Sequence, residues 1–190
     1  MNVVKVLGLG LILIFLCGCI PSLYPIYTDQ NLVDLPQLVG TWEEDGGEEA
    51  NTWEFTATDS SSYRLVYTED GEPGFFIAHV AKLGDYLFID ITPEYPDSIS
   101  QSQRDLLVPS HMFGRVQVIE DTLQIGWVDG EWLKSAIDSG KVNLQFAALE
   151  SGDILTNTTD ELQAFAVKYA ADTAVFPFSN LYRQVPQDTI

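Results

Sequence analysis

Alternation of apolar and polar residues is the clearest pattern in the chain, and it predicts β-strands from residue 38 onward. Turn residues separate the alternating segments at intervals typical of antiparallel hairpins, and Asp70-Gly71 and Gly84-Asp85 are favoured turn dipeptides. The pattern predicts strands at residues 38–44, 52–58, 63–68, 74–83, 86–92, 113–119, 122–128, 142–149 and 180–185. The residues expected to share one face of a strand are Tyr63, Leu65 and Tyr67, then Leu87, Ile89 and Ile91, then Leu123, Ile125 and Trp127.

Two later segments have the spacing of short helices. Asp129 is a good N-cap for a helix that Gly140 ends, with its apolar residues on one side. Thr158 and Glu161 have capping-box spacing at the start of a second helix, which runs to about residue 171. The apolar stripe of this helix favours a core face over a partner-binding face. Residues 94–108, flanked by prolines, predict a long loop with one helical turn that could act as a lid.

The N-terminus carries a targeting signal. Residues 6–16 form an apolar run behind Lys5, and eleven residues are too few to span a bilayer. Leu16-Cys17-Gly18-Cys19 follows and resembles the lipobox of bacterial lipoproteins. The resemblance implies diacylglycerol on Cys19, cleavage after Gly18 and acylation of the new amino terminus. The alternatives are an ordinary secretory signal with incidental cysteines and an N-terminal anchor that is never cut.

These features divide the chain into residues 1–18 as lipoprotein signal peptide, 19–36 as tether and 37–190 as a single β-rich domain. The prolines and tyrosines of the tether predict a segment that lies against the body or the membrane interface; a plain linker is the alternative. The expected location is a cell membrane, held by lipid. Because Ile20 rather than Asp follows Cys19, analogy with the sorting rule of enteric bacteria favours the outer membrane, at its periplasmic face or surface.

Charge narrows the possible partners. The chain has 28 Asp and Glu against 9 Lys and Arg, a formal net charge of −19, and its cations form no basic stripe. Nucleic-acid binding and attraction to an anionic membrane surface are therefore disfavoured. Once Cys17 leaves with the signal peptide and Cys19 carries lipid, no free thiol is left for disulfides, nucleophilic catalysis or thiolate metal sites.

Two resemblances bear on the fold. Gly40-Thr41-Trp42 with Arg183 resembles lipocalins and fatty-acid-binding proteins, in which a Trp closes one barrel end and packs against a late Arg. Residues 38–92 contain Gly40-Thr41-Trp42, Trp53-x-Phe55, Tyr63-x-Leu65-x-Tyr67 and Lys82-Leu83-Gly84 leading to Phe88-x-Asp90. Through these motifs the segment resembles a group of uncharacterised bacterial lipoproteins without an assigned activity. The sequence therefore predicts a mainly β fold, an antiparallel meander or a lipocalin-like barrel with two short helices near the C-terminus.

Candidate polar sites are few. An acidic cluster surrounds Gly46-Gly47 and would bind Ca²⁺ or form a solvated hairpin tip. His79 and His111, the two histidines, would hold a metal or perform acid–base chemistry if the fold brought them to a carboxylate such as Asp90. A half-buried, hydrogen-bonded His79 is the alternative. The cluster comprises Glu43, Glu44, Asp45, Glu48 and Glu49.

Aromatic residues are the remaining signal. In a hollow barrel they would line a pocket for a lipid or another hydrophobic molecule, whereas in a filled barrel they are the core, which this chain length favours. The candidate pocket residues are Trp42, Trp53, Tyr63, Tyr67 and Trp127.

These observations favour a lipid-anchored envelope protein with a structural or interaction role, without catalysis or a cofactor. Its expected partners are the membrane, through the lipid on Cys19, and a hydrophobic small molecule or an envelope protein. The first alternative is a lipocalin-like carrier of a hydrophobic molecule, and the second is an enzyme that uses His79 or His111.

Overall fold

A computed structural model describes residues 20–44, 50–58, 61–96, 98–104, 106–108, 110–150 and 152–184. The signal peptide, the lipobox and residues 45–49 of the acidic cluster lie outside the described residues. In the part of the chain that is described, no helix is long and apolar enough to cross a membrane.

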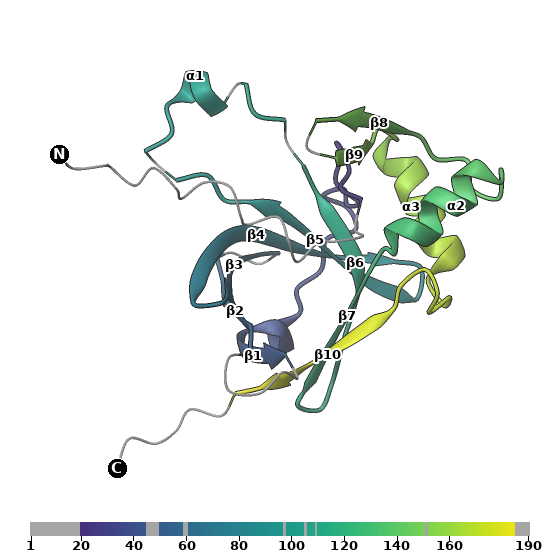
Figure 1. Cartoon of the computed structure of the whole chain (residues 1–190). Coiled ribbons are helices and arrows are strands. Elements are labelled where there is room, and N and C mark those ends of the chain that lie inside the picture. Colours follow the sequence, from purple (N-terminus) through teal and green to yellow (C-terminus); the bar gives the residue numbers. More distant parts are fainter. Residues whose placement is uncertain are drawn as a thin grey trace, which may run out of the picture.

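Eight antiparallel strands close into a barrel in the order β1-β10-β7-β6-β5-β4-β3-β2 (Figure 1). The prediction of a mainly β fold is confirmed, and the barrel is the form that it takes. Most strand bounds agree with the alternation pattern to within two residues. The barrel strands are β1 (Gly40–Glu44), β2 (Thr52–Ala57), β3 (Ser62–Glu69), β4 (Glu72–Leu83), β5 (Tyr86–Pro93), β6 (Met112–Ile119), β7 (Thr122–Trp127) and β10 (Phe178–Arg183).

Alternation directs one set of side chains into the barrel. The β3–β4 turn at Asp70 and Gly71 has both residues at positive φ, as a tight hairpin turn requires, and it pairs Glu69 with Glu72. The interior cluster consists of Leu38, Trp42, Trp53, Phe55, Tyr63, Leu65, Ala78, Val80, Ile89, Ile91, Met112, Val116, Leu123, Ile125 and Leu181. Because its largest members have almost no exposed surface, the protein's own side chains fill this part of the barrel.

One end of the barrel is closed by the 3₁₀-helix η1 (Pro36–Leu38), which brings Leu38 into the interior cluster. The Trp42 indole nitrogen donates to the Leu38 carbonyl oxygen at 2.8 Å, and the Arg183 guanidinium lies 4.1 Å from the Trp42 ring centroid. Arg183 also donates to the carbonyl oxygen of Gln37, within η1, at 2.7 Å and to that of Val39, just after it, at 3.0 Å. Gly40 is required here, because its φ is +134° and an added Cβ would lie 2.6 Å from Arg183 Nη1.

Helices and a small hairpin cover one outer wall. The predicted helices are α2 (Gly130–Asp138), capped by the Asp129 side chain, and α3 (Thr159–Tyr169), which begins with the predicted capping box. The long β5–β6 connection contains one short helix, α1 (Gln101–Arg104). The prediction of one strand at 142–149 was wrong: residues 142–145 are loop, and β8 (Phe146–Leu149) pairs with β9 (Gly152–Leu155). Val142 and Leu144 are buried without belonging to a strand, so their alternation gave a false signal.

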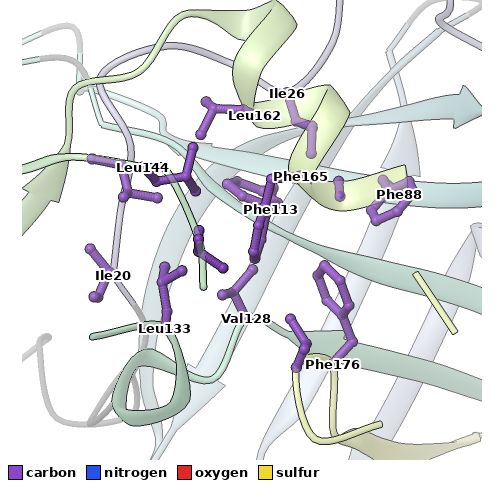
Figure 2. Close-up of a cluster of buried hydrophobic side chains, with 14 of the residues drawn as sticks. Ile20, Ile26, Phe88, Phe113, Val128, Leu133, Leu144, Leu162, Phe165 and Phe176 are labelled. Atoms are coloured by element: carbon purple, nitrogen blue, oxygen red, sulfur yellow. The ribbon is translucent and has the colours of Figure 1, made fainter. Parts of the chain in front are cut away.

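A second hydrophobic core lies between the helices and the outer face of β5 and β6 (Figure 2). Phe88 and Phe113 come from these two strands, while Leu162 and Phe165 come from α3. Residues 20–35, here called the N-terminal strap, place Ile20 and Ile26 in this core and pack Val33 and Leu35 against the interior cluster. The segment that the sequence favours as a tether therefore lies against the body over its described length.

Candidate functional site

The barrel mouth, defined here by Trp53, Tyr67, Phe76 and Trp127, lies on the side away from η1. These four aromatic side chains pack against one another or against the interior cluster, and all except Trp53 retain partial exposure. The Trp53 ring centroid lies 4.7 Å from that of Tyr67 and 6.2 Å from that of Trp127. The fold therefore gathers aromatic faces from β2, β3, β4 and β7 at one end of the barrel.

Carboxylates surround this mouth. Glu44 accepts hydrogen bonds from the Trp53 indole nitrogen at 2.8 Å and from the Asn51 amide at 3.0 Å. Burial raises the pKa of the Tyr67 hydroxyl, and the neighbouring charges of Glu44 and Glu69 raise it further. The pKa of Glu69 is itself raised by desolvation and by the charges of Asp70 and Glu44. The mouth thus has aromatic walls and a negatively charged rim.

The five candidate pocket residues do not share one environment. Trp42 and Tyr63 are fully buried near η1, where the Tyr63 hydroxyl donates to Asp34 and accepts from the Leu35 amide, each at 2.7 Å. Trp53, Tyr67 and Trp127 form the aromatic mouth. Trp42 and Tyr63 serve as core, Trp53 is a buried member of the interior cluster, and Tyr67 and Trp127 remain partly exposed.

A shallow surface pocket of about 490 Å³ is lined by Ala50, Thr52, Thr68, Asp70 and Gly71. Thr52 precedes the inward-facing Trp53 in β2, and Thr68 follows the inward-facing Tyr67 in β3. Because side chains alternate along a strand, both threonines lie on the outer face of the barrel. None of the five candidate pocket residues lines it. It lies beside the barrel mouth and does not extend the interior.

Backbone hydrogen bonds hold the N-terminal strap on the outer wall. Ser22 and His111 exchange backbone hydrogen bonds at 2.8 and 2.9 Å, and the Leu23 amide donates to the Leu155 carbonyl oxygen at 2.9 Å. Further along, the Val33 amide donates to the Val80 carbonyl oxygen at 2.9 Å. Ile20 is 7% exposed and Ile26 is fully buried, both in the second core. The strap is therefore an integral part of the fold from its first described residue.

Asp90 connects the strap to the barrel wall. Its carboxylate, 1% exposed, accepts from the Ile26 amide at 2.9 Å and lies 2.8 Å from His111 Nδ1. With its proton on Nδ1, His111 donates to this carboxylate. The fold thus brings His111 to Asp90, as one sequence hypothesis required. A carboxylate within the apolar run of β5 was the sequence signal for a buried partner.

His79 lies opposite Asp90 in the β4–β5 register and is half-buried on the outer face. Its ring stacks on Tyr27 of the strap with centroids 4.5 Å apart. Burial and the Asp90 charge raise the pKa of Tyr27 to about 12. His79, Asp90 and His111 therefore gather at one place, and the strap covers them.

The side chains of this polar site already make hydrogen bonds within the protein, and these limit the chemistry that they can perform. Asp90 is already hydrogen-bonded to the Ile26 amide and to His111. The nearby Ser22 hydroxyl donates to the Tyr24 carbonyl oxygen at 2.8 Å and lies 3.5 Å from the His111 carbonyl oxygen. No group of three or more His, Cys, Asp or Glu that could hold a metal ion occurs among the described residues. The Ile26–Asp90 hydrogen bond and the Tyr27–His79 stacking both hold the strap against the barrel wall.

No protein-family model, curated protein or solved structure matches this chain.

Proposed function

We propose that this chain is a lipid-anchored cell-envelope protein whose barrel is a structural or interaction module held at the membrane through Cys19. The observation that supports this most is the burial of Ile20 in the second core (Figure 2). A lipid on Cys19 would be attached one residue before the packed body begins. The body would then lie directly at the bilayer, without a flexible spacer.

Several hydrogen bonds hold the N-terminal strap against the rest of the domain. Hydrogen bonds tie residues 22 and 23 to β9 and to the residue before β6, and Asp90 holds the amide of Ile26. Two or three acyl chains, each contributing about 0.8 kcal/mol per buried CH₂, would anchor the chain stably where one chain is marginal. The strap would connect that anchor to the barrel wall and fix the orientation of the domain.

The proposed role does not involve catalysis. The two histidines have structural contacts: His111 pairs with Asp90, and His79 stacks on Tyr27. Filling of the barrel by its own aromatic residues also favours an interaction module over a carrier with a large internal site.

Membrane fractionation with two cysteine variants tests the proposal. In a bacterial host, the unaltered chain and Cys17→Ser should float with membrane vesicles and require detergent for release, whereas Cys19→Ser should be recovered without detergent. Cys17→Ser is the matched control, because it changes the neighbouring thiol and keeps the proposed lipid site. Equal detergent-free release of Cys19→Ser and the unaltered chain would contradict the anchor.

The barrel mouth favours a second candidate, a carrier that holds part of a hydrophobic molecule between Trp53, Tyr67 and Trp127. The partial exposure of Tyr67 and Trp127 supports it, because an apolar group could reach their ring faces without opening the core. Native mass spectrometry of the body, purified without detergent, tests it. A reproducible bound mass that Trp127→Ala abolishes would favour the carrier, and a bare mass would favour the interaction module.

A further inference from the structure

Arg115 lies between two aromatic rings on the outer wall of the barrel. It precedes Val116 of the interior cluster, so its side chain is on the outer face of β6. Its guanidinium carbon is 4.5 Å from the ring centroid of Tyr86, on β5, and 5.1 Å from that of Phe178, on β10. Nη1 donates to the carbonyl oxygen of Ala170, the C-cap residue of α3, at 2.7 Å. Contacts from three elements therefore hold the guanidinium in place.

Gly126 on β7 allows this arrangement. It pairs with Arg115 on one side and with Phe178 on the other. An added Cβ at Gly126 would lie 2.9 Å from the Phe176 carbonyl oxygen and 3.2 Å from Cδ1 of the Phe178 ring. Because no side chain stands at this position, Phe178 can reach across β7 to the guanidinium.

The positive charge of Arg115 has no counter-charge within the described part of the chain. None of the described carboxylates forms an ion pair with it, whereas Arg64 pairs with Glu94 at 2.7 Å. Burial lowers the pKa of Arg115, and the charge of Tyr86 raises it. A partly desolvated charge without a counter-ion is unfavourable. With 28 Asp and Glu against 9 Lys and Arg in the sequence, the missing partner does not reflect a shortage of carboxylates.

Donors of this site remain available. Nη2 of Arg115 makes no hydrogen bond with a described residue and is not among the buried atoms, so it faces solvent. The Tyr86 hydroxyl is in the same situation, and it is close enough to affect the pKa of Arg115. A guanidinium presents its donors in a planar fork that matches the oxygens of a carboxylate or a phosphate.

We propose that Arg115 binds an oxyanion, the phosphate or carboxylate group of a ligand, with Nη2 and the Tyr86 hydroxyl as donors. The anion supplies the counter-charge that the surrounding elements do not provide. The rings of Tyr86 and Phe178 flank the guanidinium and direct the anion to its edge. The site does not depend on Cys19 or on its lipid, so this inference is tested separately from the proposed function.

Side-chain NMR tests the proposal in the full, ¹⁵N-labelled chain, extracted from bacterial membranes in an uncharged detergent. Arg115 Nε is buried, so its proton is protected from water and its resonance reports on the guanidinium. The probes are inorganic phosphate, acetate and glycerophosphoglycerol, which is the soluble headgroup of an anionic phospholipid. Chloride at equal ionic strength is the control for screening.

The expected result is a saturable shift of the Arg115 Nε–H resonance with at least one probe and none with chloride. A tighter response to glycerophosphoglycerol than to inorganic phosphate identifies a lipid headgroup as the source of the oxyanion, and the reverse identifies a free phosphate. A response to acetate alone identifies a carboxylate ligand. Absence of a saturable shift with all three probes would overturn the inference.

Two variants test the role of the guanidinium. Arg115→Gln removes the charge, and Arg115→Lys keeps the charge but loses the fork. Each should weaken binding roughly tenfold or more, measured through the amide resonance of Phe178. Arg64→Gln is the matched control, because it removes one positive charge from an exposed ion pair and should leave binding unchanged. Equal weakening by Arg64→Gln would overturn the inference, and if Arg115→Gln does not fold, Arg115→Lys and the titration of the unaltered chain still decide it.

Discussion

Replacing Asp90 with Ala should release the N-terminal strap and destabilise the whole domain. The substitution removes the acceptor of two hydrogen bonds, from the Ile26 amide at 2.9 Å and from His111 Nδ1 at 2.8 Å. Each buried donor left without a partner costs about 1–3 kcal/mol, so we expect the free energy of unfolding to fall by roughly 2–6 kcal/mol. For a domain of this size, that loss corresponds to a decrease in Tm of roughly 4–24 °C.

Thermal unfolding of residues 19–190 with Cys19→Ser measures this loss without interference from lipid. Amide hydrogen exchange locates it: protection should decrease first across residues 22–33, while the strands of the barrel that are distant from the strap keep theirs. Asp90→Asn should lose less stability, because its amide oxygen keeps one acceptor. Glu54→Ala, at an exposed carboxylate on β2, is the control for loss of one negative charge.

The reasoning is refuted if Asp90→Ala unfolds within about 1 °C of the unaltered protein and leaves exchange in the strap unchanged. Such a result would mean that the strap is held by apolar packing alone and that the buried carboxylate contributes nothing to its position.

Three further predictions concern single contacts. Gly40→Ala should lower the free energy of unfolding by about 1–3 kcal/mol, because Gly40 has a positive φ and lies close to Arg183. The control Gly140→Ala should cost less, because an added Cβ there meets no atom within 4 Å. Equal melting temperatures for the two variants would contradict the role of the close approach. Burial raises the pKa of Tyr63 to about 12, so the fold favours the neutral phenol and stability should fall as pH rises from the ordinary value of 10.0 toward 12. Urea unfolding across that range checks this, and Tyr63→Phe should show a smaller alkaline decrease. Thr158→Ala should lower the free energy of unfolding by about 0.5–2 kcal/mol, because it removes the capping box of α3. The exposed Thr56→Ala variant is the control, and equal urea midpoints for the two variants would contradict the prediction.

Most of the barrel could be predicted from local patterns. Alternation in β3, β5 and β7 gives strands with one buried face, and turn dipeptides such as Asp70-Gly71 set the hairpins between them. The closure of the barrel could not be predicted in this way. It depends on the pairing of β1 with β10, which joins residues about 140 positions apart and leaves no local signal in the sequence. Only the resemblance that links Gly40 and Trp42 to Arg183 indicated which segments meet.

The β8–β9 hairpin and the strap show where local patterns fail. Each strand of the hairpin has four residues, and β8 contains two alanines, so its pattern is too short and too weak to separate from the preceding loop. The strap has prolines and no period, which is the composition of a linker, yet tertiary contacts bury Ile20 and Ile26. Its fixed position depends on hydrogen bonds to β9, to His111 and to Asp90 that the sequence does not encode locally.

The candidate site was only partly predictable for the same reason. The sequence named His79 and His111 as residues that would hold a metal or perform acid–base chemistry if the fold brought them to a carboxylate such as Asp90. It could not show that Tyr27 would stack on His79 or that the Ile26 amide would donate to Asp90. Likewise, the five candidate pocket aromatics could be identified as inward-facing, but their division into closed end and mouth depends on η1 and Arg183.

Intact mass spectrometry of the protein, extracted with detergent from membranes of a bacterial host, tests the central claim most directly. The account predicts a chain that begins at Cys19 and carries the additional mass of a diacylglyceryl group and of an amide-linked acyl chain, and Cys19→Ser should abolish both. A chain that begins at another residue, retains residues 1–18, or has an unmodified Cys19 would contradict the account.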